Sequence, residues 1–188
     1  EAIKRGEVTL DQEVDTLLPK GITAPSKEGG KITLRHLATH ASGLPRLPPT
    51  MKGEPSDPYA GYLRADMYAD LARAKLSAKP GKQYEYSNYG AALLGQLLAD
   101  RAGKTYAELV AERITKPLGL THTTAVFTTE NMADPHDETG ERVGYWHHDA
   151  QAGSGAVRSN VRDLAILMRA ELEAAPGSAM ALTQELQA

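Results

Sequence analysis

The sequence contains no cysteine, which excludes disulfide bonds, thiolate nucleophiles and zinc sites with cysteine ligands. It has one Phe and one Trp, and runs typical of strands are scarce, so little material is present for a sheet core. No apolar run is long enough to cross a bilayer, and no basic segment followed by an apolar one opens the chain. These absences favour a mainly α fold with few short strands.

An excess of positive charge is also lacking. Lys and Arg total 21 against 24 Asp and Glu, the net charge is −3, and the basic residues are scattered. We therefore expect neither nucleic acid nor a membrane as a partner. A chain of 188 residues with 41% hydrophobic and 24% charged residues has the composition of one folded domain, and no motif in it indicates a cofactor.

Several segments carry apolar residues at helical spacing, and residues that begin or end helices bound them. The polar, Thr-rich stretch 121–155 offers only two possible short strands, 123–128 and 142–146. The predicted helices are a short one capped by Thr33, one over 59–77, one that starts near Asn88 and that Gly103 closes, one that starts with the capping box Thr105 to Glu108, and one capped by Ser159.

The two ends of the chain lack the residues that usually bound a helix. Residues 1–6 read as the last turn of a helix that Gly6 closes, and residues 179–188 read as a helix with no Gly or Pro stop. We therefore expect an excised part of a longer protein. Within a single domain over 1–188, residues 1–20 form a connector, 31–175 a helical lobe and 176–188 the start of a truncated helix.

His36 and His40 have the i, i+4 spacing with which two imidazoles on one helix can share a metal ion. The glutamate of the H-E-x-x-H motif is absent because position 37 is Leu, and a histidine bonded to backbone near a helix end explains the pair as well. We predict no metal site. A metal-dependent hydrolase that takes a third ligand from His136 or from 147–149 stays open as a rival.

The most informative segment is Tyr84-Glu85-Tyr86-Ser87-Asn88-Tyr89-Gly90, which places three tyrosines where an apolar helix begins. Taken alone, it reads as a loop in which Ser87 or Asn88 caps the helix. Four other segments give it a context. They are Gly6 to Asp11, Ile32 to Pro45, Gly119 to Thr123, and Ala152 to Gly155 leading into Ser159 to Leu164.

Together these five segments resemble, in order, the serine β-lactamase-like superfamily, which includes class C β-lactamases, D-alanyl-D-alanine carboxypeptidases and related esterases. The resemblance covers nearly the whole chain. It implies the helical lobe of the β-lactamase and transpeptidase-like α+β fold. In that family a Ser attacks a lactam, peptide or ester carbonyl, a Lys three residues later and a Tyr share the proton transfers, and water releases the acyl-enzyme.

The resemblance assigns catalytic roles to Tyr86, as the phenol of the Tyr-x-Asn element, and to Asn88, whose amide hydrogen-bonds substrate and the catalytic Lys. A phenol with a pKa near 10 needs positive neighbours to act as a base at neutral pH. We expect Ser87 and Leu47 to contact the substrate. Class C β-lactamases carry a Gln shortly after Gly-Leu-Pro, where this chain reads Arg46-Leu47-Pro48, so a polar contact becomes apolar. This difference favours an esterase or peptidase-like parent, or an atypical lactamase.

Two parts of the family's active site are absent. None of the eight serines is followed at the third position by Lys, and the chain has no Lys-Thr-Gly or His-x-Gly strand. We therefore expect the chain alone to be inactive and the parent to be a serine hydrolase. Its partners would be a small-molecule substrate and the missing α/β half of the same protein. The resemblance implies a monomer in the periplasm or outside the cell. The alternative is a non-catalytic module that binds a peptide or cell-wall fragment.

Overall fold

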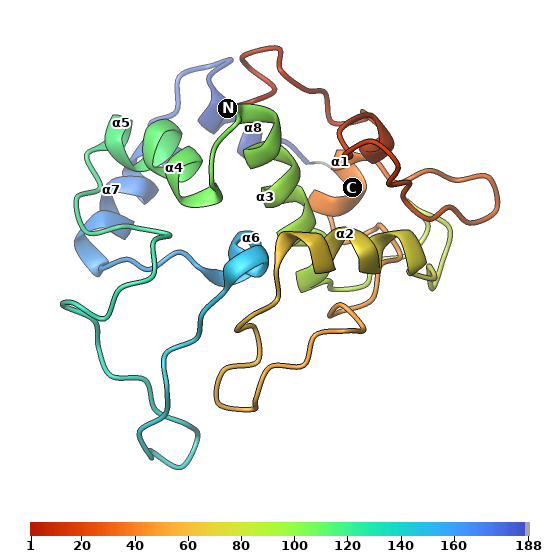
Figure 1. Ribbon diagram of the computed structural model, residues 1–188. Coiled ribbons are helices and arrows are strands. Elements are labelled where there is room, and N and C mark those ends of the chain that lie inside the picture. The colour runs from red at the N-terminus through yellow and green to blue at the C-terminus, as the bar shows by residue number, and fades with distance from the viewer. Residues whose placement is uncertain (187–188) are drawn as a thin grey trace.

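A computed structural model describes residues 1–186, and α-helices are its main regular elements (Figure 1). Short 3₁₀ turns (η1, η3) and one π-helical turn (η2) complete them. In chain order the elements are η1 (Val14–Thr16), α1 (Leu34–Ala38), α2 (Arg64–Arg73), α3 (Asn88–Ala102), α4 (Tyr106–Val110), η2 (Ala111–Thr115), α5 (Lys116–Leu118), η3 (Asp149–Gln151), α6 (Ala152–Gly155), α7 (Val161–Leu172) and α8 (Ala179–Thr183). The mainly helical fold predicted from the sequence is confirmed.

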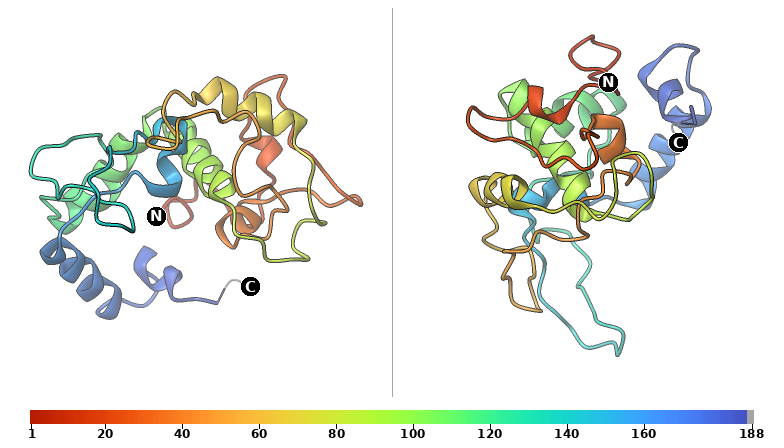
Figure 2. Two further views of the ribbon diagram at one scale, coloured as in Figure 1. Left: turned by 90° about the horizontal axis from the view of Figure 1, so that it is seen from below. Right: turned by 90° about the vertical axis from the view of Figure 1, so that its right-hand side faces the viewer.

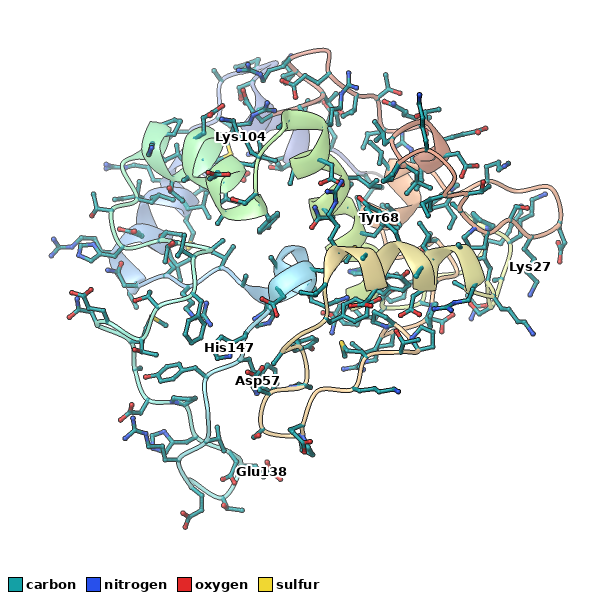
Figure 3. All side chains as sticks on the ribbon, viewed as in Figure 1. Lys27, Asp57, Tyr68, Lys104, Glu138 and His147 are labelled. Atoms are coloured by element: carbon teal, nitrogen blue, oxygen red, sulfur yellow. The ribbon has the colours of Figure 1, made fainter. Side chains whose placement is uncertain are left out.

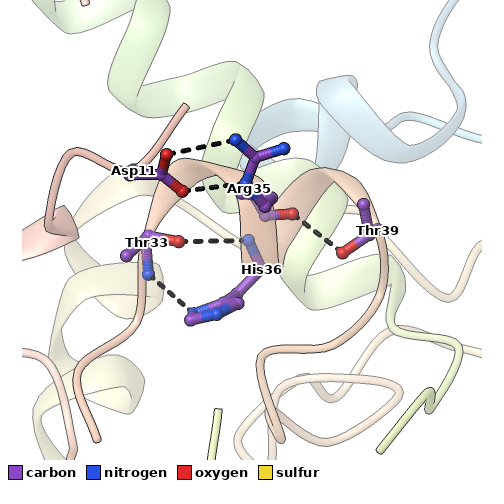
Figure 4. Close-up of polar contacts among 5 residues, drawn as sticks. All are labelled: Asp11, Thr33, Arg35, His36 and Thr39. Atoms are coloured by element: carbon purple, nitrogen blue, oxygen red, sulfur yellow. Dashed lines mark hydrogen bonds and ion pairs between the residues drawn. The ribbon is translucent and has the colours of Figure 1, made fainter. Parts of the chain in front are cut away.

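Threonine side chains begin two helices where the sequence predicts them. The Thr33 hydroxyl accepts a hydrogen bond from the His36 N–H at 3.3 Å, and His36 Nδ1 accepts one from the Thr33 N–H at 3.2 Å (Figure 4). Thr105 and Glu108 form the equivalent capping box at α4. Each box satisfies N–H groups that have no partner within the first helical turn.

Glycines in the left-handed region end helical turns. Gly103 closes α3 with φ 64°. At the start of the chain, the N–H groups of Gly6 and Glu7 donate to the carbonyls of Ile3 and Ala2 at 2.9 and 3.0 Å, and Gly6 has φ 69°. This pair of bonds is the Schellman arrangement that ends a helical turn, as the sequence predicts for residues 1–6.

The predicted helix over 59–77 is too long, because the structure has α2 only over Arg64–Arg73. Gly61 adopts φ 73°, outside the helical region, and its N–H donates to Asp149 Oδ2 at 2.9 Å. A contact with a distant loop thus replaces the first turn of the predicted helix. At α7 the cap is also shifted by one residue: Asn160 Oδ1, not Ser159, accepts the Asp163 N–H at 2.8 Å.

The predicted strands over 123–128 and 142–146 do not form. Within residues 1–186, extended segments pair only through isolated bridges, among them Thr124 with Arg158 and His136 with Arg142. In the loop after α5, the Asp137 carboxylate accepts the N–H groups of Thr139 and Glu141 at 2.9 and 3.0 Å. The Asp137 side chain therefore accepts backbone N–H groups that would donate to a neighbouring strand in a sheet. The loop projects from the helical body, with Glu138 near its tip (Figure 3).

Helix α3 lies at the centre of the molecule, in contact with α1, α4 and α6 (Figure 1). Its Tyr89, Leu93 and Leu97 side chains are fully buried. Helix α6 crosses it so closely that a Cβ on Gly153 would lie 2.8 Å from the Ala91 carbonyl oxygen. Only glycine permits this approach, so the small α6 sequence is what brings residues 149–155 against the central helix.

Helices α7 and α8 stand at one edge of the molecule in both views of Figure 2. The helix predicted over 179–188 begins at Ala179 after the cap Ser178 and ends at Thr183, and its last two residues lie outside the described part. Within residues 1–186, no helix is both long and apolar enough to cross a membrane.

Candidate functional site

The candidate site is built on the N-terminal end of α3. Ser87 caps this helix in an extended conformation, so Tyr86 lies just before the cap and Asn88 is the first helical residue. The Tyr86 side chain is 47% exposed, and Asn88 is half-buried. The two predicted catalytic residues therefore flank the cap at the start of α3.

A second segment, residues 40–46, lies against this corner. The Ser87 hydroxyl donates to the Pro45 carbonyl at 2.7 Å, and the Tyr89 N–H donates to the Arg46 carbonyl at 3.1 Å. On the other side of Tyr86, the Glu85 N–H donates to the His40 carbonyl at 2.8 Å. The segment that follows α1 thus fixes the backbone on both sides of Tyr86.

The surroundings of Ser87 favour a role inside the fold, and its substrate contact stays a prediction. Its hydroxyl donates to Pro45 and accepts the Gly90 N–H at 2.9 Å, and the residue is 1% exposed. Both of its hydrogen-bonding roles are used inside the fold. Ser87 is therefore the cap of α3, the local interpretation that the sequence also allowed. Leu47 is exposed on the neighbouring segment, and its substrate contact stays a prediction.

Tyr86 differs from the tyrosines around it. Tyr62 and Tyr89 are buried, and burial raises the pKa of each phenol far above its ordinary value, which keeps both protonated. Tyr86 instead lies at the surface with the Arg46 guanidinium 5.7 Å from its ring centre. An arginine over an aromatic face is an attractive contact. Tyr86 thus differs from the two buried tyrosines by its exposure, and from the exposed Tyr84 by the arginine over its ring.

Three aromatic rings, which we call the aromatic wall, stand next to Asn88. Tyr59 stacks on His148 with ring centres 4.8 Å apart and meets Trp146 edge-on at 5.5 Å. The Asn88 side-chain amide donates to the Tyr59 hydroxyl at 3.5 Å. Burial lowers the pKa of His148, so its ring in the stack is neutral at pH 7. The wall gives this side of the site an apolar surface.

Two loops distant in sequence are joined to make this wall. The N–H of His147 donates to Asp57 Oδ1 at 2.9 Å, the His147 ring lies 2.5 Å from Asp57 Oδ2, and Figure 3 shows the two side chains side by side. Sequence reasoning missed Tyr59 and Trp146 as site residues and considered His148 only as a metal ligand. The one Trp of the chain, placed in a polar loop, was the available signal.

The histidine pair does not form the metal site that the rival interpretation needs. Helix α1 ends at Ala38, and His40 has φ 55°, so His36 and His40 do not share a helical face. Their Nδ1 atoms accept the N–H groups of Thr33 and Ser87, both at 3.2 Å. In the described part of the chain, no three His, Asp or Glu side chains gather as a metal ion would require.

A hollow of about 720 Å³ opens on another side of α3. Its lining includes Arg64, Asp100 and Lys104 around the C-terminal half of that helix, and it reaches His148 at the back of the aromatic wall. Neither Tyr86 nor Asn88 lines it. The candidate site is therefore an open corner, separate from this hollow.

The fold and this corner define a protein of the serine β-lactamase-like class. Residues 1–188 match the family model described as Beta-lactamase, and the chain belongs to this family. It is 36% identical over 152 residues to the D-alanyl-D-alanine-carboxypeptidase/endopeptidase AmpH of Escherichia coli K12, a match that spans 76% of this chain and 39% of that protein. It is 32% identical over 133 residues to a D-aminopeptidase of Gluconobacter oxydans, across 70% of this chain and 24% of that protein.

Solved structures agree with the fold. A beta-lactamase/D-alanine carboxypeptidase from Yersinia pestis superposes with a TM-score of 0.82 at 30% identity, covering 98% of this chain and 53% of that one. A class C beta-lactamase superposes with a TM-score of 0.76 at 23% identity, covering 97% of this chain and 49% of that one, which shows the fold alone. The chain spans about half, or less, of the length of these relatives.

Proposed function

We propose that this chain is the helical half of a serine hydrolase that cleaves a β-lactam, a D-alanyl peptide or an ester through an acyl-enzyme. The observation that carries the proposal is an exposed Tyr86 and a half-buried Asn88 on either side of the cap of α3, in a chain of the beta-lactamase family. These two groups supply a proton-transfer phenol and a hydrogen-bonding amide at one corner.

In the proposed reaction a serine outside residues 1–188 attacks the substrate carbonyl. Its hydroxyl proton passes to the Tyr86 oxygen, which accepts it as a phenolate held by positive neighbours, and the phenol so formed then protonates the leaving group as the bond to the carbonyl carbon breaks. The Asn88 amide hydrogen-bonds the substrate and holds it against the phenol. Water then attacks the acyl-serine, the acid is released and the serine regains its proton.

Because the chain has no Ser-x-x-Lys motif, it should have no catalytic activity by itself. We expect purified 188-residue protein to turn over neither nitrocefin nor a p-nitrophenyl ester, and to keep its mass after incubation with penicillin. A stoichiometric acyl adduct in the intact mass would show a nucleophile within these residues and would overturn the proposal.

We further propose that the partner of this lobe is the remaining half of the same protein. Support comes from α7, where Val161, Leu164, Met168 and Leu172 form an apolar stripe with side chains that are 85, 48, 64 and 84% exposed. An apolar stripe of this kind marks a contact surface. With one such half attached, we propose a monomer. The Escherichia coli relative is bacterial, and we propose a periplasmic or secreted location for the longer protein.

In the longer protein, Tyr86→Phe should lower kcat by about 10²–10⁴-fold, because the phenyl ring keeps the packing and loses the proton-transferring oxygen. The matched control is Tyr84→Phe, which removes a hydroxyl from another exposed tyrosine two residues away. We expect the control to keep activity within about 3-fold. Equal activity of wild type and Tyr86→Phe would reject the catalytic role. A reading frame with no Ser-x-x-Lys before Glu1 would instead favour the binding-module alternative.

A further inference from the structure

His40 is the residue of the 40–46 segment that the proposed chemistry leaves unexplained. It follows α1 by two residues and has φ 55°, a left-handed conformation that non-glycine residues rarely adopt. Such a conformation persists when surrounding contacts hold it, and it clusters at functional sites. Apart from the bond from its N–H to the Leu37 carbonyl at 3.4 Å, the contacts that hold His40 involve the chain around Tyr86.

The backbone and side chain of His40 bond to the two neighbours of Tyr86. The His40 carbonyl accepts the Glu85 N–H at 2.8 Å, and His40 Nδ1 accepts the Ser87 N–H at 3.2 Å. Since the Nδ1 atom accepts, the ring proton is on Nε2. In this left-handed conformation His40 presents its carbonyl and its ring to the amides on either side of Tyr86.

The ring of His40 also contacts the Tyr86 ring directly. The two ring centres are 4.6 Å apart with the planes tilted by 37°, while the Tyr84 ring meets His40 edge-on at 5.8 Å. The Arg46 guanidinium is 5.7 Å from the Tyr86 ring centre. Within residues 1–186, the Tyr86 hydroxyl has no hydrogen-bond partner, so these ring contacts and the two backbone bonds orient it.

We propose that His40 is a positioning residue that orients the Tyr86 phenol for proton transfer, an inference that rests on the proposed role of Tyr86. It acts in three ways on one neighbour: it fixes the amide before Tyr86, fixes the amide after it and limits the rotation of its ring. Catalytic groups displaced by about 1 Å can lose about 10²-fold in rate, which is why such a residue matters without touching the substrate.

The test replaces His40 by Asn, which tolerates the left-handed conformation and can accept a hydrogen bond but has no ring. The matched control is His36→Asn, the same chemical change at the capping histidine of α1 four residues earlier. Two readouts are used. One is the ring resonances of Tyr86 in the 188-residue chain with ¹³C-labelled tyrosine, and the other is kcat and KM of the longer enzyme.

We expect His40→Asn to move the Tyr86 ring signals toward those of a freely rotating tyrosine and to lower kcat by about 10- to 100-fold, with KM within about 3-fold. His36→Asn should change neither the Tyr86 signals nor kcat by more than about 3-fold. Unchanged Tyr86 signals in His40→Asn overturn the inference, and so do equal effects of the two variants, since these would show a general loss of structure.

A second variant separates the ring contact from the hydrogen bond. His40→Phe keeps an aromatic ring against Tyr86 and removes the Nδ1 acceptor, so its Tyr86 signals should lie closer to wild type than those of His40→Asn. If they lie further from wild type, the ring contact is not what orients Tyr86. If His40→Asn moves the Tyr86 signals while kcat is unchanged, His40 still orients Tyr86, and it is the proposed function of Tyr86 that fails.

Discussion

Helices α3 and α7 carry similar apolar spacing in sequence and lie in opposite environments. In α3 the Tyr89, Leu93 and Leu97 side chains are fully buried among α1, α4 and α6. In α7 the stripe from Val161 to Leu172 is exposed, and the helix packs against α5 and α8. An apolar stripe thus shows which face a helix will bury, and a facing element decides whether it does so in this chain.

The two helices are also held by different forces. Helix α3 is fixed by packing, whereas α7 is fixed at its first turn by one buried carboxylate. Asp163 Oδ2 accepts the His122 N–H and the Thr123 hydroxyl, both at 2.8 Å, and the residue is nearly inaccessible. Such bonds tie the start of α7 to the segment after α5 while its apolar side stays open.

The largest predicted effect contrasts one leucine from each helix. Leu93→Ala should lower the free energy of unfolding by about 2–5 kcal/mol, because it leaves a cavity beside fully buried neighbours. Leu172→Ala should change it by no more than about 0.5 kcal/mol in the isolated chain. Urea unfolding followed by circular dichroism measures both. Similar losses in the two variants would mean that α7 is as well packed as α3.

The next effect tests the polar attachment of α7. Asp163→Ala should destabilise the chain by about 2 kcal/mol, because two donors lose a charged acceptor in a buried place. Glu173→Ala at the other end of α7 is the control, since its exposed pair with Arg169 spans 3.5 Å and contributes about 0–1 kcal/mol. Hydrogen exchange should show faster opening of α7 in Asp163→Ala alone. Equal exchange in both variants would contradict the proposed anchor.

The smallest effect is a pH-dependent change in stability. It arises at η2, the turn that leads into α5, and α5 packs against α7. Arg113, between α4 and α5, donates to Glu7 at 2.7 and 3.0 Å, and with Arg5 it lowers the pKa of the Glu7 carboxyl from 4.5 to about 2. A lowered folded-state pKa stabilises the fold above pH 4.5, and this contribution is lost as the pH falls toward 2.

Wild type should therefore unfold at a higher temperature than Glu7→Gln at pH 6, and the gap should close as the pH approaches 2. In an Arg113→Met background, the same substitution should show much less pH dependence, because the coupling partner is gone. A gap that stays constant from pH 6 to pH 2 would disprove the assignment of the pH effect to this ion pair.

The parts of the fold that depend on neighbours in sequence were predictable. The capping boxes at Thr33 and Thr105, the glycine ends at Gly6 and Gly103, and the stripe of α7 all arise from groups three to five residues apart. The predicted strands and the start of α2 were wrong because distant or side-chain partners took the donors that those elements would have used.

For the site, the family resemblance of the sequence pointed to Tyr86 and Asn88, and their catalytic roles stay predictions; the structure puts them on either side of Ser87, the cap of α3. The sequence could not predict the aromatic wall, because Asp57 and His147, which join the two loops of the wall, are 90 positions apart. Nor could it show that the hydroxyl of Ser87 is used internally, because Pro45 is 42 positions away.

By itself, the sequence determined that this chain is mainly helical and where most of its helices begin and end. Those features depend on hydrogen bonds and side-chain spacing within a turn or two of helix. Only the tertiary structure decided that the apolar stripe of α3 is buried and that of α7 is exposed. It also decided that His40 hydrogen-bonds to Ser87 and contacts the Tyr86 ring. Burial and long-range hydrogen bonds depend on which distant segments come into contact. The local spacing of apolar residues does not specify those contacts.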